Sequence, residues 1–152
     1  MKLRFVWAGK TKNAPLRSLL DDYLERLRRF TRAEVVELRD RSGEGEAALA
    51  CEGEDILKRV EGDPFVILLD ERGRSFTSAE LATLLEDKMA TALKQITFVV
   101  GSHDGIAACV RARADMILSL SPMTLTHEMA RMVLMEQTYR AHTIIRGLKY
   151  QR

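Results

Sequence analysis

The residues best placed for chemistry follow two apolar runs of the chain. The turn at residues 101–105 (GSHDG) comes directly after the apolar residues 96–100, and the polar, glycine-bearing segment 70–74 follows the apolar residues 65–69. A glycine turn lets a ligand approach the backbone closely. In α/β proteins, ligands bind beyond the carboxyl ends of the strands. We therefore predict a ligand site at the ends of the last strands of an α/β fold.

Neither segment carries the motif of a known reaction. The turn at 101–105 matches neither GxGxxG nor a Walker loop, so it is weak as a phosphate cradle. The histidines at 103, 127 and 142 do not share metal-ligand spacing, and we expect no metal site. A Ser-His-Asp triad stays open, although no nucleophile elbow is present. The residues alone predict a ligand-binding α/β domain without naming its reaction.

Apolar periodicity predicts strands alternating with helices along the whole chain. Strands are expected at residues 2–8, 34–38, 65–69, 96–100 and 116–118. Helices are expected at residues 15–30, 46–60, 78–93 and 106–113, and from a cap at Thr126 to residue 145, with Ser78 as the cap of the third. The prediction is an α/β fold of one domain, residues 1–152, with a mostly parallel sheet and helices on both faces.

Length and composition agree with a globular protein. Of 152 residues, 46% are hydrophobic and 30% charged, and no apolar run approaches the roughly 20 residues of a membrane span. Cys51 and Cys109 do not make a disulfide framework, so we expect reduced thiols in a cytoplasmic protein, with a single bridge as the alternative. Met129, Met132 and Met135 recur at helical spacing, and we interpret them as core side chains rather than a cofactor surface.

The net charge of +2 is distributed unevenly. Residues 1–32 carry nine Lys and Arg against three acids and residues 106–152 seven against three, whereas residues 33–105 carry eight against sixteen. If the two basic ends meet in the fold, they form one positive surface suited to a polyanion such as RNA. The alternative is a solvated surface on which charges balance. The densest cluster ends the first helix, where the helix dipole also favours it, and consists of Arg26, Arg28, Arg29 and Arg32.

Several short motifs occur in a characteristic order along the chain. They are Tyr23-Leu24-Glu25-Arg26, Leu68-Leu69-Asp70 with Gly73, Val100-Gly101 to Gly105, Leu118-Ser119-Leu120-Ser121, Thr124-Leu125-Thr126-His127, EQTYRA at 136–141, and Gly147 with Tyr150. No single motif is decisive. Their order, their spacing and the short chain resemble the RlmH family of ribosomal RNA methyltransferases, in the knotted SPOUT superfamily, over essentially the whole length.

The resemblance implies a homodimer, a deep C-terminal trefoil knot and S-adenosylmethionine as the cofactor. It implies methyl transfer to N3 of a pseudouridine in the helix 69 loop of 23S ribosomal RNA, within the assembled ribosome. Knots are essentially absent from ordinary folds, so the pattern alone does not predict one. In this family the cofactor is held largely by backbone groups. Carried over, this implicates Leu69, Gly101, Gly105, Leu120, Ser121, Pro122, Met123, Thr124 and Leu125.

The resemblance also brings the basic tail, residues 146–152, toward the site and the RNA. Transfer to N3 requires that the N3 proton leaves and that the charge gathering on the ring is stabilised. We expect His127 to orient the substrate or handle the proton, and the remaining candidates to hold the substrate. Those candidates are Arg140, Tyr150 and Arg152. The alternatives are that His127 only closes the helix start and that Arg140 pairs with Glu136 one turn earlier.

Two residues depart from the family pattern. Ser102 stands where a second glycine is usual, and Gln151 stands where the tail usually has a histidine. Glutamine cannot take a proton at neutral pH, so a tail-histidine base is not available here. A non-catalytic ribosome-binding protein on the same fold is therefore one alternative. A flavodoxin-like domain that binds a nucleotide or flavin is the other, because strand–helix alternation alone allows it.

Overall fold

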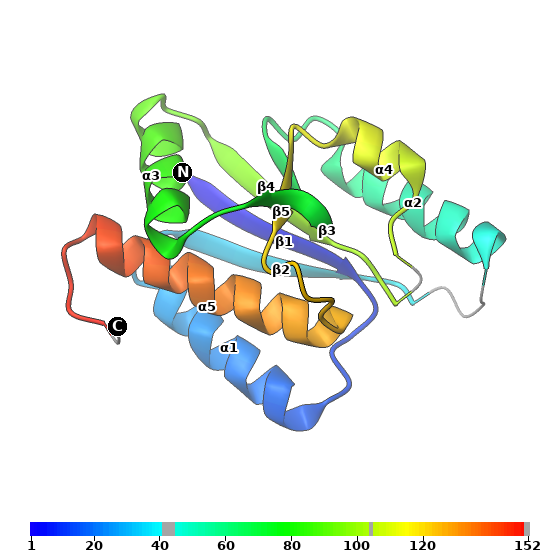
Figure 1. Ribbon diagram of the computed structural model, residues 1–152, viewed down its shortest axis with the longest axis horizontal. Helices are drawn as coiled ribbons and strands as arrows, with labels where there is room; N and C mark the ends of the chain where they lie inside the picture. The colour runs from blue at the N-terminus through cyan, green and yellow to red at the C-terminus, as the bar shows by residue number, and fades with distance from the viewer. Residues whose placement is uncertain (41–44, 104, 151–152) are drawn as a thin grey trace.

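Five parallel strands form the central sheet of the computed structural model, which describes residues 1–40, 45–103 and 105–150 (Figure 1). The strands are β1 (Lys2–Ala8), β2 (Arg32–Leu38), β3 (Val66–Ser75), β4 (Gln95–Val100) and β5 (Met116–Ser119). They lie in the order β2-β1-β4-β3-β5, and every neighbouring pair is parallel. The predicted parallel sheet is confirmed. Its interior strands are β1, β4 and β3, whose long apolar runs suit burial on both faces.

Helices cover both faces of the sheet, as predicted. One face carries α1 (Ala14–Arg28), α3 (Ser78–Ala90) and α5 (His127–Ile145), and the other carries α2 (Glu46–Val60) and α4 (Ala108–Arg113) (Figure 1). β1 shows how alternation divides the core, because Phe5 and Trp7 pack in the first layer and Val6 in the second. None of the helices among the described residues is long and apolar enough to cross a membrane.

Capping residues begin α3 and α5, and one of the two predicted caps is displaced by one residue. Thr126 caps α5, as predicted, because its side chain accepts a backbone N–H of the first turn at 3.3 Å. The prediction of Ser78 as the cap of α3 is wrong by one residue, since Thr77 and Glu80 form a reciprocal capping box there. The Ser78 hydroxyl instead donates to Gln137 of α5 at 2.6 Å. That bond ties α3 to α5 on the same face of the sheet.

β3 extends further than the sequence predicts. The strand is expected to end at residue 69, before the polar segment 70–74, but it continues to Ser75. Leu69 and Arg74 are both in register with Leu118 of β5, so the residues between them bulge out before pairing resumes. A Cβ on Gly73 would lie 2.7 Å from the Ile117 carbonyl carbon, and only glycine permits this approach to β5. Polarity in the sequence does not distinguish such a bulge from a turn.

The sulfur-containing side chains are divided between core and surface. Met132 and Met135 are buried, as predicted for core side chains, whereas Met129 is 40% exposed. Cys51 and Cys109 are both exposed and unbridged. The outward turn of Met129 places an apolar side chain on the free surface of α5.

Candidate active site

A pocket of about 810 Å³ lies at the carboxyl ends of β3, β4 and β5, beside the first turn of α5. This is the edge of the sheet at which the site was predicted, and the volume suits a ligand of cofactor size. Eight of the nine predicted cofactor-binding residues line it: Leu69, Gly101, Gly105, Leu120, Ser121, Met123, Thr124 and Leu125. Pro122 is not among the lining residues.

Two glycines and a buried carboxylate shape the turn after β4. A Cβ on Gly101 would lie 2.4 Å from the carbonyl oxygen of Gly105, so no larger residue fits without moving the turn. Gly105 has a φ of +95°, which favours glycine. The backbone N–H of Ser102 donates to Glu52 of α2 at 3.2 Å, and Glu52 is only 7% exposed. The turn is therefore held from behind by α2.

A glycine also brings α2 close enough to hold that turn. A Cβ on Gly53 would lie 2.6 Å from the Cβ of Ala107 and 3.0 Å from the Sγ of Cys109. The segment leading into α4 therefore packs directly against the α2 backbone. Glycine costs about 1 kcal/mol in a helix interior, and here it is retained where the packing needs it.

The segment after β5 is held by bonds from its own side chains. The Ser119 hydroxyl donates to the carbonyl oxygen of Ser121 at 3.0 Å, and the Ser121 hydroxyl accepts the backbone N–H of Met123 at 2.9 Å. The Thr124 hydroxyl donates to Glu71 in the bulge of β3 at 2.6 Å. These hydroxyl groups are engaged within the protein. The segment therefore offers a ligand mainly backbone groups and apolar side chains.

An ion pair in the pocket lining was missed in the sequence. Asp70 accepts a hydrogen bond from the guanidinium of Arg111 in α4 and another from the backbone N–H of Arg72. Burial raises the pKa of Asp70, but these two hydrogen bonds outweigh it and bring the pKa below its usual value. The carboxylate is therefore ionised at neutral pH. The position of Asp70 after an apolar strand was a signal, whereas nothing in the sequence pairs it with Arg111.

His127, the candidate for proton handling, lines the pocket as the first residue of α5. Its ring centroid lies 6.3 Å from that of His103 in the turn after β4. Burial lowers the pKa of His127, the charge of Arg131 lowers it further, and Glu128 opposes them only in part. The imidazole is therefore neutral at pH 7 and able to accept a hydrogen bond or a proton. In the described part of the chain, no group of three His, Cys, Asp or Glu residues is arranged to hold a metal ion.

A buried arginine fixes the turn of α5 that carries His127. Arg131 is fully buried, donates to the carbonyl at the end of β1 at 2.5 Å and to the Thr11 hydroxyl at 3.1 Å, and lies 5.1 Å from the ring of Trp7. Burial lowers the pKa of Arg131. Glu128 accepts hydrogen bonds from the backbone N–H groups of Lys12 and Asn13, in the loop after β1, at 2.7 and 3.2 Å. The start of α5 is thereby attached to the end of β1.

The other catalytic candidates gather at the far end of α5. The Tyr150 hydroxyl lies 2.8 Å from that of Tyr23 in α1, and the guanidinium of Arg140 lies 4.7 Å from the centre of the Tyr150 ring. Arg140 also pairs with Glu136 one turn earlier, which was the alternative interpretation. Burial and the hydrogen bond with Tyr23 raise the pKa of Tyr150, so its hydroxyl keeps its proton at neutral pH.

Within one chain, these two sets of candidates do not meet. Arg140 follows His127 by thirteen residues along a continuous helix, which amounts to about 20 Å at 1.5 Å per residue. The segment between α5 and Tyr150 lies beyond the end of α5 and away from the helix start (Figure 1). The candidate Arg152 and the departure at Gln151 are outside the described residues. The structure thus brings His127, and not Arg140 or Tyr150, to the pocket of its own chain.

The sequence matches a family model described as "Predicted SPOUT methyltransferase" over residues 1–151. It is 43% identical over 151 residues to "Ribosomal RNA large subunit methyltransferase H" of Geobacter metallireducens, covering 99% of this chain and 98% of that protein. The protein of the same name from Streptococcus gordonii is 37% identical over 159 residues, covering all of both chains. These matches run the full length of the described fold.

Solved structures of methyltransferases share the fold. A tRNA (m1G37) methyltransferase from Aquifex aeolicus aligns with a TM-score of 0.57 at 17% identity, over 100% of this chain and 77% of that one. A probable methyltransferase from Bordetella pertussis aligns with a TM-score of 0.58 at 12% identity, over 94% and 95%. At such identities the likeness concerns the fold alone. Fold, pocket and full-length identity together show that this chain belongs to the SPOUT methyltransferases, in the family of ribosomal RNA large subunit methyltransferase H.

Proposed function

We propose that this chain transfers a methyl group from S-adenosylmethionine to N3 of a pseudouridine in helix 69 of 23S ribosomal RNA, on the assembled ribosome. The observation that carries the proposal is the identity of 43% over 99% of the chain with a relative named for methylation of large-subunit ribosomal RNA. Membership of this family also argues against the flavodoxin-like alternative, which rested on strand–helix alternation alone.

The pocket fits the proposed cofactor. Gly101 and Gly105 form a cradle that a Cβ would fill, and the segment after β5 turns backbone groups and apolar side chains toward it. Backbone groups of this lining could bind the polar edge of an adenine, and the Asp70 carboxylate in the same lining carries a charge opposite to that of the sulfonium group. When bound, S-adenosylmethionine supplies an electrophilic methyl group. The residues that would hold it are Leu69, Gly101, Gly105 and residues 120–125.

Methyl transfer to N3 requires that residues of the chain accept the N3 proton and stabilise the negative charge that develops on the ring. We assign the N3 proton to His127, which lines the pocket and is neutral at pH 7. Arg131 keeps a positive charge buried behind the same helix turn, and it fixes the position of His127. Arg140 and Tyr150 are assigned to holding the substrate, the first by its charge and the second by a hydroxyl that retains its proton.

Arg140 lies about 20 Å from His127 along α5, and Tyr150 packs against Arg140 beyond the helix end, so we propose that a second copy of the chain supplies both. A homodimer with antiparallel α5 helices would bring the tail of one copy to the pocket of the other. Apolar side chains exposed along α5 and the tail support this arrangement, namely Met129 at 40%, Ile144 at 45% and Leu148 at 53%. Apolar surface of this kind is stabilised by burial against a partner.

The trefoil knot implied by the family is likewise a proposal for this chain. Its support is the close passage of two segments far apart in sequence. Gly73 lies against the β5 backbone, and Thr124 bonds to Glu71 across the pocket. The bulge of β3 and the segment after β5 are therefore the two parts that would cross.

The test of the proposed function is methyl transfer from labelled S-adenosylmethionine to ribosomes that lack the modification, with the labelled nucleotide mapped. Label on N3 of the helix 69 pseudouridine is the expected result, and it would show that Gln151 is compatible with catalysis. Cofactor binding and ribosome binding without transfer would instead favour the non-catalytic alternative. Label at another nucleotide would keep the enzyme class and change its target.

A further inference from the structure

A second groove, of about 850 Å³, lies at the amino-terminal edge of the sheet, where β1 and β2 begin and α1 ends. Positive groups dominate its lining: the α-amino group of Met1 and the side chains of Lys2, Arg28, Arg29, Arg32 and Lys94. Among the described residues of the lining, Glu34 is the one acid. We call this surface the basic groove. It lies at the opposite edge of the sheet from the cofactor pocket.

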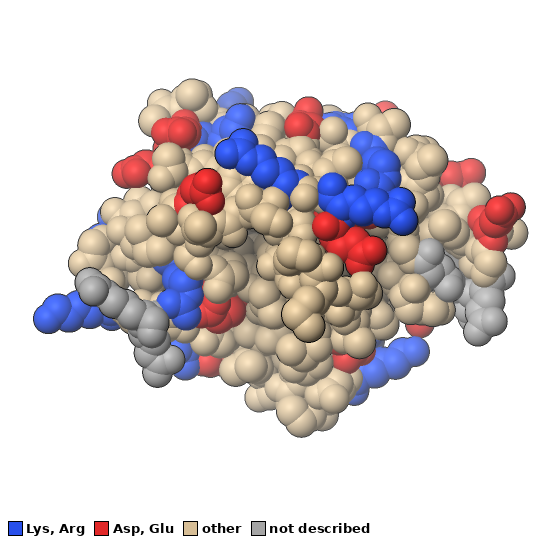
Figure 2. Space-filling view, in the orientation of Figure 1, with Lys and Arg blue, Asp and Glu red and all other residues tan. Residues whose placement is uncertain are grey.

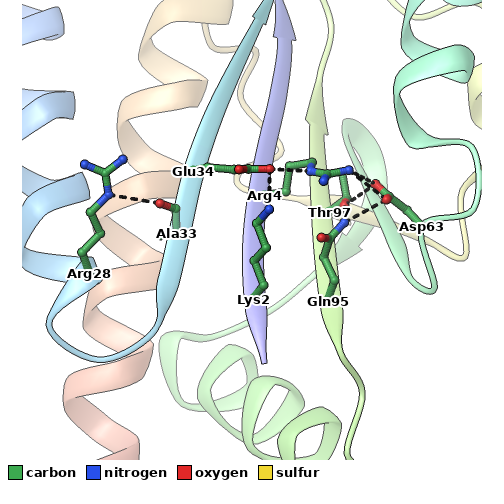
Figure 3. Close-up of polar contacts among 8 residues, drawn as sticks. All are labelled: Lys2, Arg4, Arg28, Ala33, Glu34, Asp63, Gln95 and Thr97. Carbon is green, nitrogen blue, oxygen red and sulfur yellow. Dashed lines mark hydrogen bonds and ion pairs between the residues drawn. The ribbon is translucent and has the colours of Figure 1, made fainter.

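Glu34 in the basic groove and Asp63 beside it both form ion pairs with positive side chains of the protein. Glu34 contacts the Nζ of Lys2 and the Nε of Arg4, both at 2.8 Å. The hydrogen bond from Lys2 lowers the pKa of Glu34, burial opposes it, and Arg4 lowers it further. Arg4 also pairs with Asp63 at 2.9 Å, and Asp63 accepts further bonds from side chains of β4 (Figure 3). Both carboxylates therefore pair with Arg4, and Glu34 also pairs with Lys2, so neither compensates the remaining cations of the groove.

The outer cations are arranged for a ligand with several negative groups. Arg28 is oriented by a hydrogen bond of 3.1 Å from its Nε to the carbonyl of Ala33, with its terminal nitrogens turned away from the strand (Figure 3). Arg29, Arg32 and Lys94 are exposed, and no carboxylate within residues 1–40, 45–103 and 105–150 forms an ion pair with them. Arg and Lys side chains spread along a groove are suited to phosphate groups.

The side of the molecule that Figure 2 shows, which includes the bulge of β3 as well as α3 and α5, does not present the same concentration of charge. Figure 2 shows Lys and Arg side chains on this face interspersed with Asp and Glu around a largely uncharged centre. A polyanion would therefore find balanced charge on this face and excess positive charge at the amino-terminal edge of the sheet.

We propose that the basic groove binds the sugar–phosphate backbone of ribosomal RNA, at nucleotides other than the methylated one. The inference rests on the proposed function for the identity of the RNA. β1 spans seven residues between the groove and the pocket edge, about 20 Å at 3.3 Å per residue, so one nucleotide cannot occupy both. Backbone contacts position a protein without reading sequence. The groove would orient this small fold on a large RNA surface while the pocket selects the nucleotide.

The test compares two double substitutions that each remove two exposed positive charges near a helix end. R29Q/R32Q removes them from the basic groove, and K58Q/R59Q removes them from the last turn of α2 on the other face of the sheet. Binding to unmodified ribosomes is measured by sedimentation over a range of salt concentrations, and binding of S-adenosylmethionine by calorimetry. For R29Q/R32Q we expect about tenfold weaker ribosome binding and a salt dependence reduced by about 2 in slope. Cofactor affinity should stay unchanged, and K58Q/R59Q should behave as wild type.

The outcomes separate this inference from the proposed function. If wild type methylates ribosomes and R29Q/R32Q binds them as tightly as K58Q/R59Q does, the proposed role of the groove is overturned and the proposed function stands. If wild type binds without methyl transfer while R29Q/R32Q binds more weakly, the groove stands and the function falls. Wild type that binds no ribosomes overturns both. Loss of ribosome binding with unchanged binding to protein-free 23S ribosomal RNA would assign the groove to an acidic ribosomal protein and overturn the RNA assignment.

Discussion

At the residue scale, the proposed role of His127 in accepting the N3 proton can be tested directly. We expect His127→Gln to lower kcat by about 100-fold, because proton transfer by a positioned side chain contributes that order of rate. The affinity for S-adenosylmethionine should remain within about twofold, since the proposed cofactor contacts are made mainly by backbone groups. Single-turnover transfer to ribosomes, with the cofactor affinity measured separately, would show both effects. A large loss of cofactor affinity with unchanged kcat would make His127 a binding residue instead.

The pH dependence of methyl transfer tests the same residue. Burial holds the pKa of His127 below the 6.5 of an ordinary histidine, so the imidazole stays neutral as the pH falls to that value. The wild-type rate should be flat around pH 7 and decline only below pH 6.5 as the ring is protonated. In His127→Gln this acidic decline should disappear. An identical decline in the variant would assign it to another group.

His142 makes the stability of the fold depend on pH. It is 3% exposed, its Nδ1 donates to the Thr138 carbonyl, and its Nε2 has no hydrogen-bond partner within the described residues. Burial lowers the pKa of His142, Thr138 opposes this, and the charge of Arg146 adds to it. Below pH 6.5 the unfolded chain therefore binds a proton that the folded protein resists. The associated stability is present above pH 6.5 and is lost as the pH falls toward the folded pKa.

We expect His142→Phe to remove this dependence. Each pH unit over which only the unfolded chain is protonated costs about 1.4 kcal/mol of folding free energy. Denaturant unfolding at pH 7.5 and pH 5.5 should therefore show a smaller difference for the variant than for wild type. Phenylalanine keeps the contact with Phe30, 6.1 Å away between ring centroids, so the variant should still fold. Equal differences in the two proteins would show that His142 does not titrate in this range.

At the scale of elements, the turn after β4 depends on α2 as well as on its own glycines. Glu52 accepts the Ser102 N–H, and Gly53 lets α2 lie close enough to do so. Removing one such hydrogen bond costs about 1 to 1.5 kcal/mol, or close to tenfold in affinity. Glu52→Ala should therefore weaken cofactor binding by about that factor, whereas Glu52→Gln keeps a carbonyl acceptor and should weaken it less. Calorimetric titration of both variants would check this order, and equal affinities would remove Glu52 from the support of the site.

Gly101 tests the turn itself. Alanine is already too large at this position, since its Cβ would lie 2.4 Å from the Gly105 oxygen. We expect Gly101→Ala to lower cofactor affinity at least tenfold, because the turn must move to accommodate the methyl group. The circular dichroism spectrum should remain that of wild type. An unchanged affinity for Gly101→Ala would place the cofactor away from this turn.

At the scale of the whole molecule, the separation of the catalytic candidates predicts an active site shared between two copies. Neither His127→Gln nor Tyr150→Phe alone should be fully active. If the two copies exchange tails, a mixed dimer of these variants contains one intact site and one doubly altered site. Refolding an equal mixture should then recover about a quarter of the wild-type activity, because half of the dimers are mixed and half of their sites are intact. Activity no higher than the average of the two variants would place the whole site within one chain.

Much of the fold could be predicted because the relevant physics is local. The apolar runs of β3 and β4, the cap at Thr126 and the alternation along β1 each depend on neighbours in the chain, and the structure confirms them. The glycine turn after β4 and its position at a strand end likewise predicted a site at the edge of the sheet where the pocket lies. The cap of α3 was misplaced by one residue, because Thr77 and Ser78 are both good caps and the capping box with Glu80 favours Thr77.

The sequence by itself therefore determined the order of strands and helices along the chain, the parallel sheet and the edge of the sheet at which the pocket lies. Tertiary structure alone decided the features that join residues far apart in the chain. These are the pairing that continues β3 through a bulge, the contact of Arg111 with Asp70, and the burial of Arg131 against β1. It also decided that α5 keeps Tyr150 away from His127, because a rigid helix of nineteen residues separates its two ends. Local sequence periodicity does not predict such contacts, because their free energy depends on which distant segments of the chain meet in the folded structure.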